Sequence, residues 1–111
     1  MAVFLFSSVA GFSMAKNPEC SDPNNWAAAM AHIHLKNAKL ISNEAIDFSK
    51  TKVKLMASEK LSSDVYRQIH LVTFVEKAGH QIEVITSNEA SSKECSMSPV
   101  QVFVISEKLG G

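Results

Sequence analysis

YRQIHLVTFVEKAGHQIEVITS, residues 66–87, consists of two runs rich in Ile, Val, Phe and Thr that flank the five residues EKAGH at 76–80. A short connection with glycine near its end is typical of a type I turn that closes with a left-handed glycine. The stretch therefore predicts a β-hairpin in which Gly79 has a positive φ. We expect the other elements to pack around this hairpin.

The turn also sets the register of the hairpin. With Glu76 opposite His80, counting back along both strands puts three cross-strand pairs on one face: Phe74 with Ile82, Val72 with Val84, and His70 with Thr86. The centre of this face is apolar, so we expect it to line the core. The opposite face, with Thr73, Glu83 and Gln81, should be wetter. A slip of one residue would exchange the two faces.

Residues 1–15, MAVFLFSSVAGFSMA, are uncharged and apolar, and Ser13 and Ala15 are the small residues that a signal peptidase requires before its cleavage point. This pattern predicts an export signal, although no basic residue precedes Lys16. The alternative is a first core strand. A membrane-spanning helix is not expected, because it takes about 20 residues. Residues 16–111 should then form a single small domain.

Cys20 and Cys95 are the two cysteines of the chain. In an exported protein they predict one disulfide with no alternative pairing. Neither cysteine has a CxxC partner or a neighbouring histidine, so we expect neither thiol redox chemistry nor a structural zinc site.

The charges of the chain are balanced, with 11 basic and 11 acidic side chains and no basic block. This balance disfavours nucleic acid and anionic membrane surfaces as partners.

A helix should follow the turn-forming residues 16–25, because Ser21 or Asp22 before Pro23 resembles a helix start. We expect it to span about 23 to 41. At helical spacing its apolar face would carry Trp26, Met30, Ile33, Asn37 and Leu40 or Ile41. Residues 32–36 also alternate strictly, and this leaves open a strand that follows a shorter helix.

Two further strands are expected on either side of the hairpin. Residues 51–61 alternate, with Val53, Leu55 and Ala57 on one side, which predicts a half-buried strand. Residues 100–106 are apolar on both faces, which predicts an inner strand. A polar loop, 88–99, should precede the second strand, and EKLGG at 107–111 should be a frayed tail.

One helix followed by about four strands with short connections predicts an α+β fold, in which the helix packs across an antiparallel sheet. This order resembles that of cystatin-like folds. The QVVAG-type loop of that architecture is absent, because QIHLV at 68–72 has the pattern of a strand. No motif assigns the chain to a family.

The chain contains no GxSxG motif and no glycine-rich phosphate loop, so no catalytic residue and no cofactor is expected. His32 and His34 are the candidate metal ligands. No third ligand follows at a recognised spacing, so we expect no tight metal site.

These observations favour a small periplasmic or secreted, non-enzymatic module that binds or inhibits another protein. Its contact surface would be the loop 88–99, since loops on a rigid scaffold often carry binding residues. The candidate contacts are Ser91, Ser92, Lys93 and Met97. The alternative is a periplasmic protein that binds a metal or a small ligand through His32 and His34.

Overall fold

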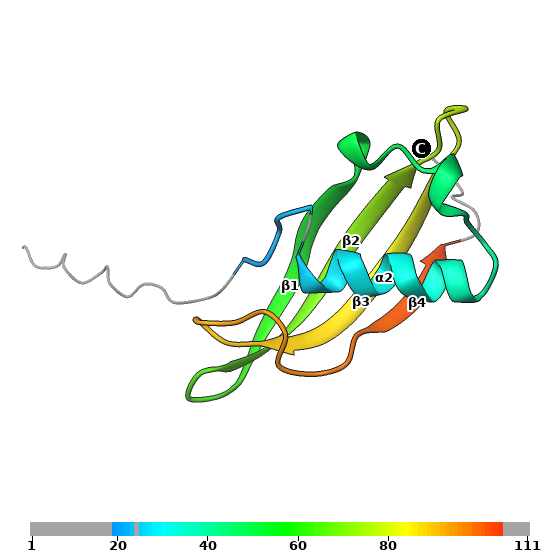
Figure 1. Cartoon of the computed structure of the whole chain (residues 1–111). Helices are drawn as coiled ribbons and strands as arrows, with labels where there is room; N and C mark the ends of the chain where they lie inside the picture. The colour runs from blue at the N-terminus through cyan, green and yellow to red at the C-terminus, as the bar shows by residue number, and fades with distance from the viewer. Residues whose placement is uncertain (1–18, 24, 106–111) are drawn as a thin grey trace, which may run out of the picture.

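The computed structural model describes residues 19–23 and 25–105. One helix, α2 (Trp26–Asn37), lies across one face of a four-stranded antiparallel sheet (Figure 1). The strands follow one another in the sheet as they do in the chain: β1 (Lys52–Ser62), β2 (Val65–Val75), β3 (Gln81–Ala90) and β4 (Gln101–Ile105). Two short 3-10 helices join α2 to β1: η3 (Asn43–Ala45) and η4 (Phe48–Lys50). The fold is therefore α+β, as predicted.

Two sequence predictions fall outside the described residues. They are the export signal at 1–15 and the frayed tail at 107–111.

The central hairpin has the predicted register. Phe74 pairs with Ile82, and the pairing continues without a break to Tyr66 and Ala90. The backbone N–H of Glu76 donates to the carbonyl of His80 at 2.8 Å. Gly79 has a φ of 102°, which confirms the left-handed glycine of the turn.

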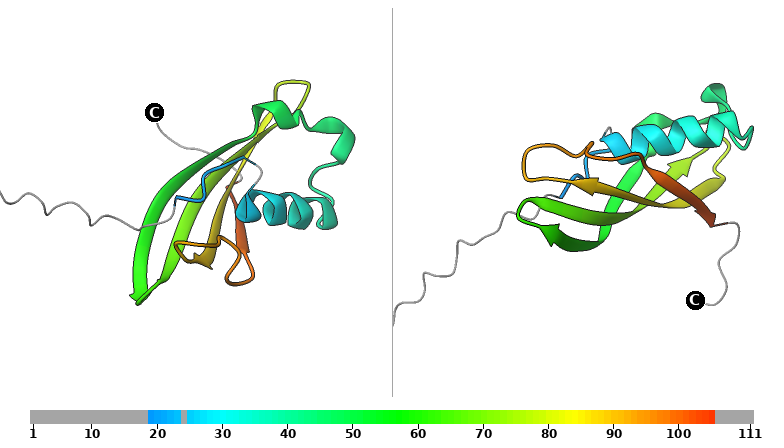
Figure 2. Two further views of the ribbon diagram at one scale, coloured as in Figure 1. Left: turned by 60° about the vertical axis from the view of Figure 1, so that its left-hand side comes forward. Right: turned by 90° about the horizontal axis from the view of Figure 1, so that it is seen from below.

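The core lies between α2 and the face of the hairpin that carries Val72, Phe74 and Val84. Figure 2 shows the helix on this face of the curved sheet. The helix contributes Ala27, Ala28, Ala31 and Leu35 to the buried surface. Small alanine side chains allow the helix to approach the sheet closely, so the alanine side of α2 is the one that is buried.

The predicted core face is therefore wrong within the helix, although Ile41, just beyond the helix, is buried as predicted. Ile33, which the spacing placed in the core, is 44% exposed, and Asn37 is exposed as well. Met30 is half-buried, and Trp26 donates its indole N–H to the carbonyl of Ser98 at 3.1 Å. Beside its buried alanine side, the helix thus carries a second, outward-facing apolar stripe, which consists of Met30 and Ile33.

The helix begins and ends inside the predicted limits of 23 and 41, and residues 32–36 are helical. Asn25 is the N-cap, in place of Ser21 or Asp22, and its side-chain oxygen accepts from the backbone N–H of Ala28 at 2.8 Å. Asp22 instead accepts the backbone N–H of Asn25. That bond closes a turn, and a turn is also a favoured position for the intervening proline.

The helix ends because Lys39 adopts a left-handed φ of 63°. The N–H of Lys39 donates to Lys36, and the N–H of Leu40 donates to the carbonyl of Leu35, both at 2.9 Å. These two bonds form a Schellman motif, which usually has glycine where Lys39 stands.

Strand β1 alternates as predicted only as far as Leu55. The register with β2 then shifts between Leu55 and Ala57, so Met56 is the extra residue of a β-bulge. Ala57 is exposed as a result, contrary to the prediction, and Ser58 accepts a hydrogen bond from Gln68 at 3.2 Å.

Two predictions at the C-terminal end of the sheet are also wrong. Strand β3 continues to Ala90, so Asn88 belongs to the strand and is buried. Strand β4 is an edge strand, since it pairs with β3 alone among the described strands. Phe103 and Val104 are 55% and 45% exposed. Strand β4 is therefore apolar on both faces although it lies at an exposed edge of the sheet and not inside it.

The predicted disulfide is present. Cys20 and Cys95 are joined, with their Cα atoms 5.9 Å apart. The bond ties the segment before α2 to the loop that leads into β4.

Candidate functional site

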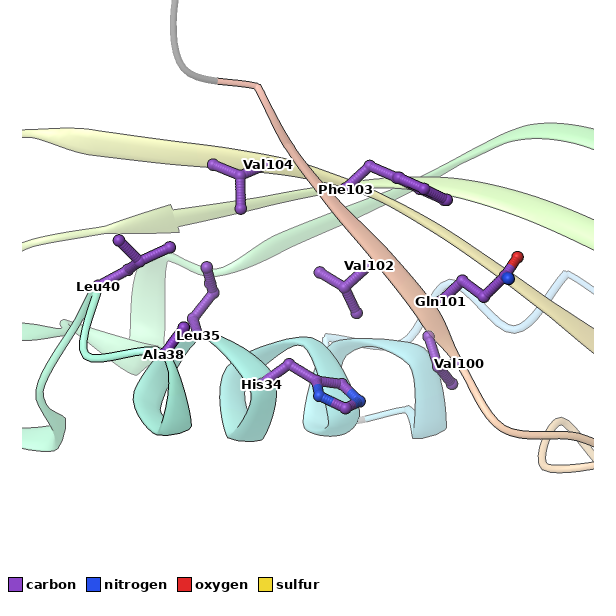
Figure 3. A pocket seen from close by; sticks show the side chains of 9 residues that line it. All are labelled: His34, Leu35, Ala38, Leu40, Val100, Gln101, Val102, Phe103 and Val104. Atoms are coloured by element: carbon purple, nitrogen blue, oxygen red, sulfur yellow. The ribbon is translucent and has the colours of Figure 1, made fainter.

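A groove of about 450 Å³ runs between the C-terminal half of α2 and strand β4 (Figure 3). Its walls come from two stretches of chain, 34–40 and 100–104. Figure 3 shows Val102 and Val104 on the side of β4 that is turned toward Leu35, whereas Phe103 lies on the other side of the strand. The alternation of β4 thus directs its two central valines into the groove.

The end of the helix places one wall of this groove. In a Schellman motif the residue two positions beyond the cap commonly contacts the third-last helical residue. Here these residues are Leu40 and Leu35, and both line the groove. The left-handed conformation of Lys39 therefore brings Leu40 back over the groove opposite Val104.

The groove is apolar except near one end. Of the nine described residues that line it, His34 and Gln101 are the two with polar side chains. Figure 3 shows the His34 ring toward the end of the groove near Val100, whereas the Gln101 side chain lies on the same side of β4 as Phe103. A second hollow of about 220 Å³ shares Leu40 and Val104 with the groove and extends it toward the hairpin turn. This hollow also has Glu76, His80 and Gln81 in its lining, so the combined surface has an apolar centre with polar groups toward both ends.

The two histidines of the helix lie on different sides of it. His34 lines the groove, whereas His32 lines a separate pocket of about 110 Å³ next to Phe48 and Thr51. Burial lowers the pKa of His32 and the nearby Lys36 lowers it further, while a hydrogen bond with Asn43 raises it. The structure therefore does not bring His32 and His34 together as a ligand pair.

Residues 19–23 and 25–105 contain no group of three His, Cys, Asp or Glu side chains that could hold a metal ion. A metal-binding experiment has still to test the expectation of no tight site.

The predicted contact residues lie in the loop between β3 and β4. Ser92 donates its backbone N–H and its hydroxyl to the carboxylate of Asp64, at 3.1 and 2.9 Å, and this ties the loop to the β1–β2 turn. The hydroxyl of Ser91 accepts the backbone N–H of Lys93 at 3.1 Å. Lys93 and Met97 are exposed. Both serines thus hold the loop in shape, which leaves Lys93 and Met97 as the side chains open to a partner.

A buried polar cluster occupies the core face beneath the disulfide. It consists of Gln68, His70, Thr86 and Asn88. The Nε2 atom of His70 lies 3.0 Å from the carbonyl oxygen of Glu19, and the Asn88 amide donates to the carbonyl of Cys95 at 2.9 Å. The cluster therefore holds the disulfide-linked segments onto the sheet, and those segments close it off from solvent.

Sequence reasoning missed the groove for one reason. It placed β4 inside the sheet and the apolar stripe of α2 in the core, so neither could border an open surface. The signal that could have located the groove is the occurrence of two apolar sides on one helix.

None of the helices in the described part of the chain has the length and apolar character needed to cross a membrane. Comparison of the chain with protein-family models, with curated proteins and with solved structures gave no match.

Proposed function

We propose that this protein is an exported, non-enzymatic binding module that holds a small, largely apolar molecule in the groove between α2 and β4. The observation that carries the proposal is the lining of the groove. Apolar side chains dominate it and His34 stands near one end, which is the usual composition of a small-molecule site. The volume of about 450 Å³ is within the range of such sites.

The polar end indicates the class of ligand. The His34 imidazole can donate or accept a hydrogen bond, and no carboxylate, lysine or arginine lines the groove. A molecule with a hydrocarbon body and one hydroxyl or carboxyl group, such as a medium-chain alcohol or acid, fits this arrangement. The hydrocarbon would lie along Val102, Val104 and Leu40, with the polar group near His34.

Export is supported by the sequence of residues 1–15 and by the disulfide. Disulfides persist mainly in oxidising compartments. If the signal is cleaved after Ala15, the exported protein should begin at Lys16, and N-terminal sequencing of the exported fraction tests this.

The binding test uses an uncharged fluorescent probe, N-phenyl-1-naphthylamine, with medium-chain acids and alcohols as competitors. Wild-type protein should bind the probe, and Leu40→Lys should weaken binding by about tenfold or more, because it places a charge in an apolar site. Leu61→Lys is the matched control, since Leu61 is 40% and Leu40 is 54% exposed, and Leu61 lies on β1 away from the groove.

Equal weakening by the two substitutions, or no probe binding by the wild type, would contradict the proposal. His34→Ala tests the orientation of the ligand. It should reduce competition by the acids and alcohols more than it reduces binding of the probe.

A further inference from the structure

In the described part of the chain, the groove is open along one side, and two surfaces without a packing partner border that opening. The first is the free edge of β4, and the second is the outward apolar stripe of α2. Small-molecule sites usually bury most of the ligand surface, so an open groove lacks a wall. A partner that covers the β4 edge and the apolar stripe of α2 would supply the missing wall of the groove.

The free edge of β4 is unusual for an exposed edge. Phe103, Val104 and Ile105 are three consecutive exposed apolar residues, and residues 101–105 include no charge. The pairing of β4 with β3 has no register shift that would turn the edge away. Exposed edges with these properties pair readily with another strand.

The apolar stripe of α2 lies on the same side of the molecule as the free edge. Met30 and His34 are four residues apart and therefore share one side of the helix. His34 lines the groove beside β4, so Met30 also lies toward β4. Together with Ile33 and Asn37, this side of the helix has no carboxylate, lysine or arginine.

We infer that a second copy of the chain occupies both surfaces, with the two β4 strands pairing antiparallel about Phe103. In this register Phe103 pairs with itself, Val102 pairs with Val104, and Gln101 pairs with Ile105. No charges meet in this register, and the twofold axis repeats each residue pair, as a self-complementary interface requires. The row of Leu71, Ile85 and Phe103 would continue across the interface into its counterpart.

The pairing also closes the groove. Helix α2 packs over β3 and β2, so two helices related by the twofold axis would stand about four strand spacings, or about 19 Å, apart. Helices in direct contact are about 8–10 Å apart. The remaining space is an apolar cleft, which the Met30 side chains of both copies border. The proposed dimer does not depend on a bound ligand, whereas its role in closing the groove rests on the proposed function.

Sedimentation equilibrium of the purified, disulfide-intact chain tests the dimer, over about 1 to 500 µM. The wild type should show a monomer–dimer equilibrium. Phe103→Lys should raise the dissociation constant by about 30-fold or more, because two like charges would face each other at the twofold axis. Met56→Lys is the matched control, since Met56 is 51% exposed on the opposite edge strand, and it should dimerise like the wild type.

A wild type that is monomeric throughout, a Phe103→Lys variant that still dimerises, or an equal loss in Met56→Lys would overturn the inference. Circular dichroism and thermal unfolding establish that both variants are folded. Probe binding separates the two proposals. A dimer that does not bind N-phenyl-1-naphthylamine leaves the interface standing and removes the proposed function. Probe binding by the monomer as tight as by the dimer removes the closing role of the second copy.

Discussion

The two edges of the sheet differ in charge and in regularity. Strand β1 carries Lys52, Lys54, Glu59 and Lys60, and its pairing with β2 has two register shifts. Strand β4 has no charged residue and no register shift. Lysines and bulges are common protections of a sheet edge against pairing. The comparison indicates that β1 is protected against another strand and that β4 is open to one.

The two edges also differ in what they lead to. The edge of β4 borders the apolar groove and the apolar stripe of α2. On the other side of the helix is the small pocket at His32, next to Thr51, the residue before β1. The interactions that we propose are therefore confined to one side of the molecule, and each of the following experiments treats the two sides differently.

Loss of the disulfide should have the largest effect. In the Cys20→Ser/Cys95→Ser variant the free energy of unfolding should fall by about 4.5 kcal/mol, because the bond closes a loop with a sequence separation of 75. Urea denaturation measures this loss. Amide hydrogen exchange in β4 should accelerate more than exchange in β1, since Cys95 anchors the loop that leads into β4. Equal acceleration in the two strands would contradict this role of the disulfide.

A matched pair of valines compares what the two edges contribute to the core. Val53 in β1 and Val102 in β4 are both partly buried and packed against the core cluster. Each Val→Ala substitution removes two methyl groups and should lower the free energy of unfolding by about 1 kcal/mol. Equilibrium denaturation should therefore give similar values for the two variants. A Val102→Ala effect near zero would show that β4 does not pack on the core in solution.

Lys39→Gly should stabilise the protein, by about 0.5–1 kcal/mol, because glycine adopts the left-handed conformation without the penalty of a Cβ atom. Lys36→Gly is the control, and it should destabilise by about 1 kcal/mol because Lys36 is exposed within the helix. Thermal unfolding measures both changes. If Lys39→Gly destabilises as much as Lys36→Gly, the helix does not end in the motif that places Leu40 over the groove.

The smallest effect concerns pH and the β1 side of the helix. Because burial lowers the pKa of His32 in the folded chain, the unfolded chain takes up a proton more readily. The contribution of neutral His32 to the free energy of unfolding is thus present above the unfolded pKa of about 6.5 and is lost as the pH falls below it. Stability curves measured between about pH 7 and pH 5 should be flatter for His32→Gln than for the wild type. Identical slopes would show that His32 does not carry this dependence.

The sequence predicted those features that local chemistry determines. The hairpin register follows from the alternation of apolar residues and from a glycine at the one turn position that needs a positive φ. The disulfide follows from the presence of two cysteines, Cys20 and Cys95. The order of the elements was enough to indicate the α+β class.

The features that the sequence did not predict depend on competition between surfaces. The helix has two sides that could be buried, and the alanine side is buried because it packs more closely than the side with Met30 and Ile33. The apolar pattern of β4 fits an inner strand and an exposed interaction edge equally well, and only its place in the sheet separates them. Both errors concern the same side of the molecule, which is the side of the candidate site.

Amide hydrogen exchange at two protein concentrations tests the difference between the edges most directly. Raising the concentration of the disulfide-intact wild type from well below to well above the dissociation constant should slow exchange in β4, because its outward N–H groups gain partners. Exchange in the outward N–H groups of β1 should not change. Slower exchange in β1, or no change in β4 at any concentration, would contradict the account.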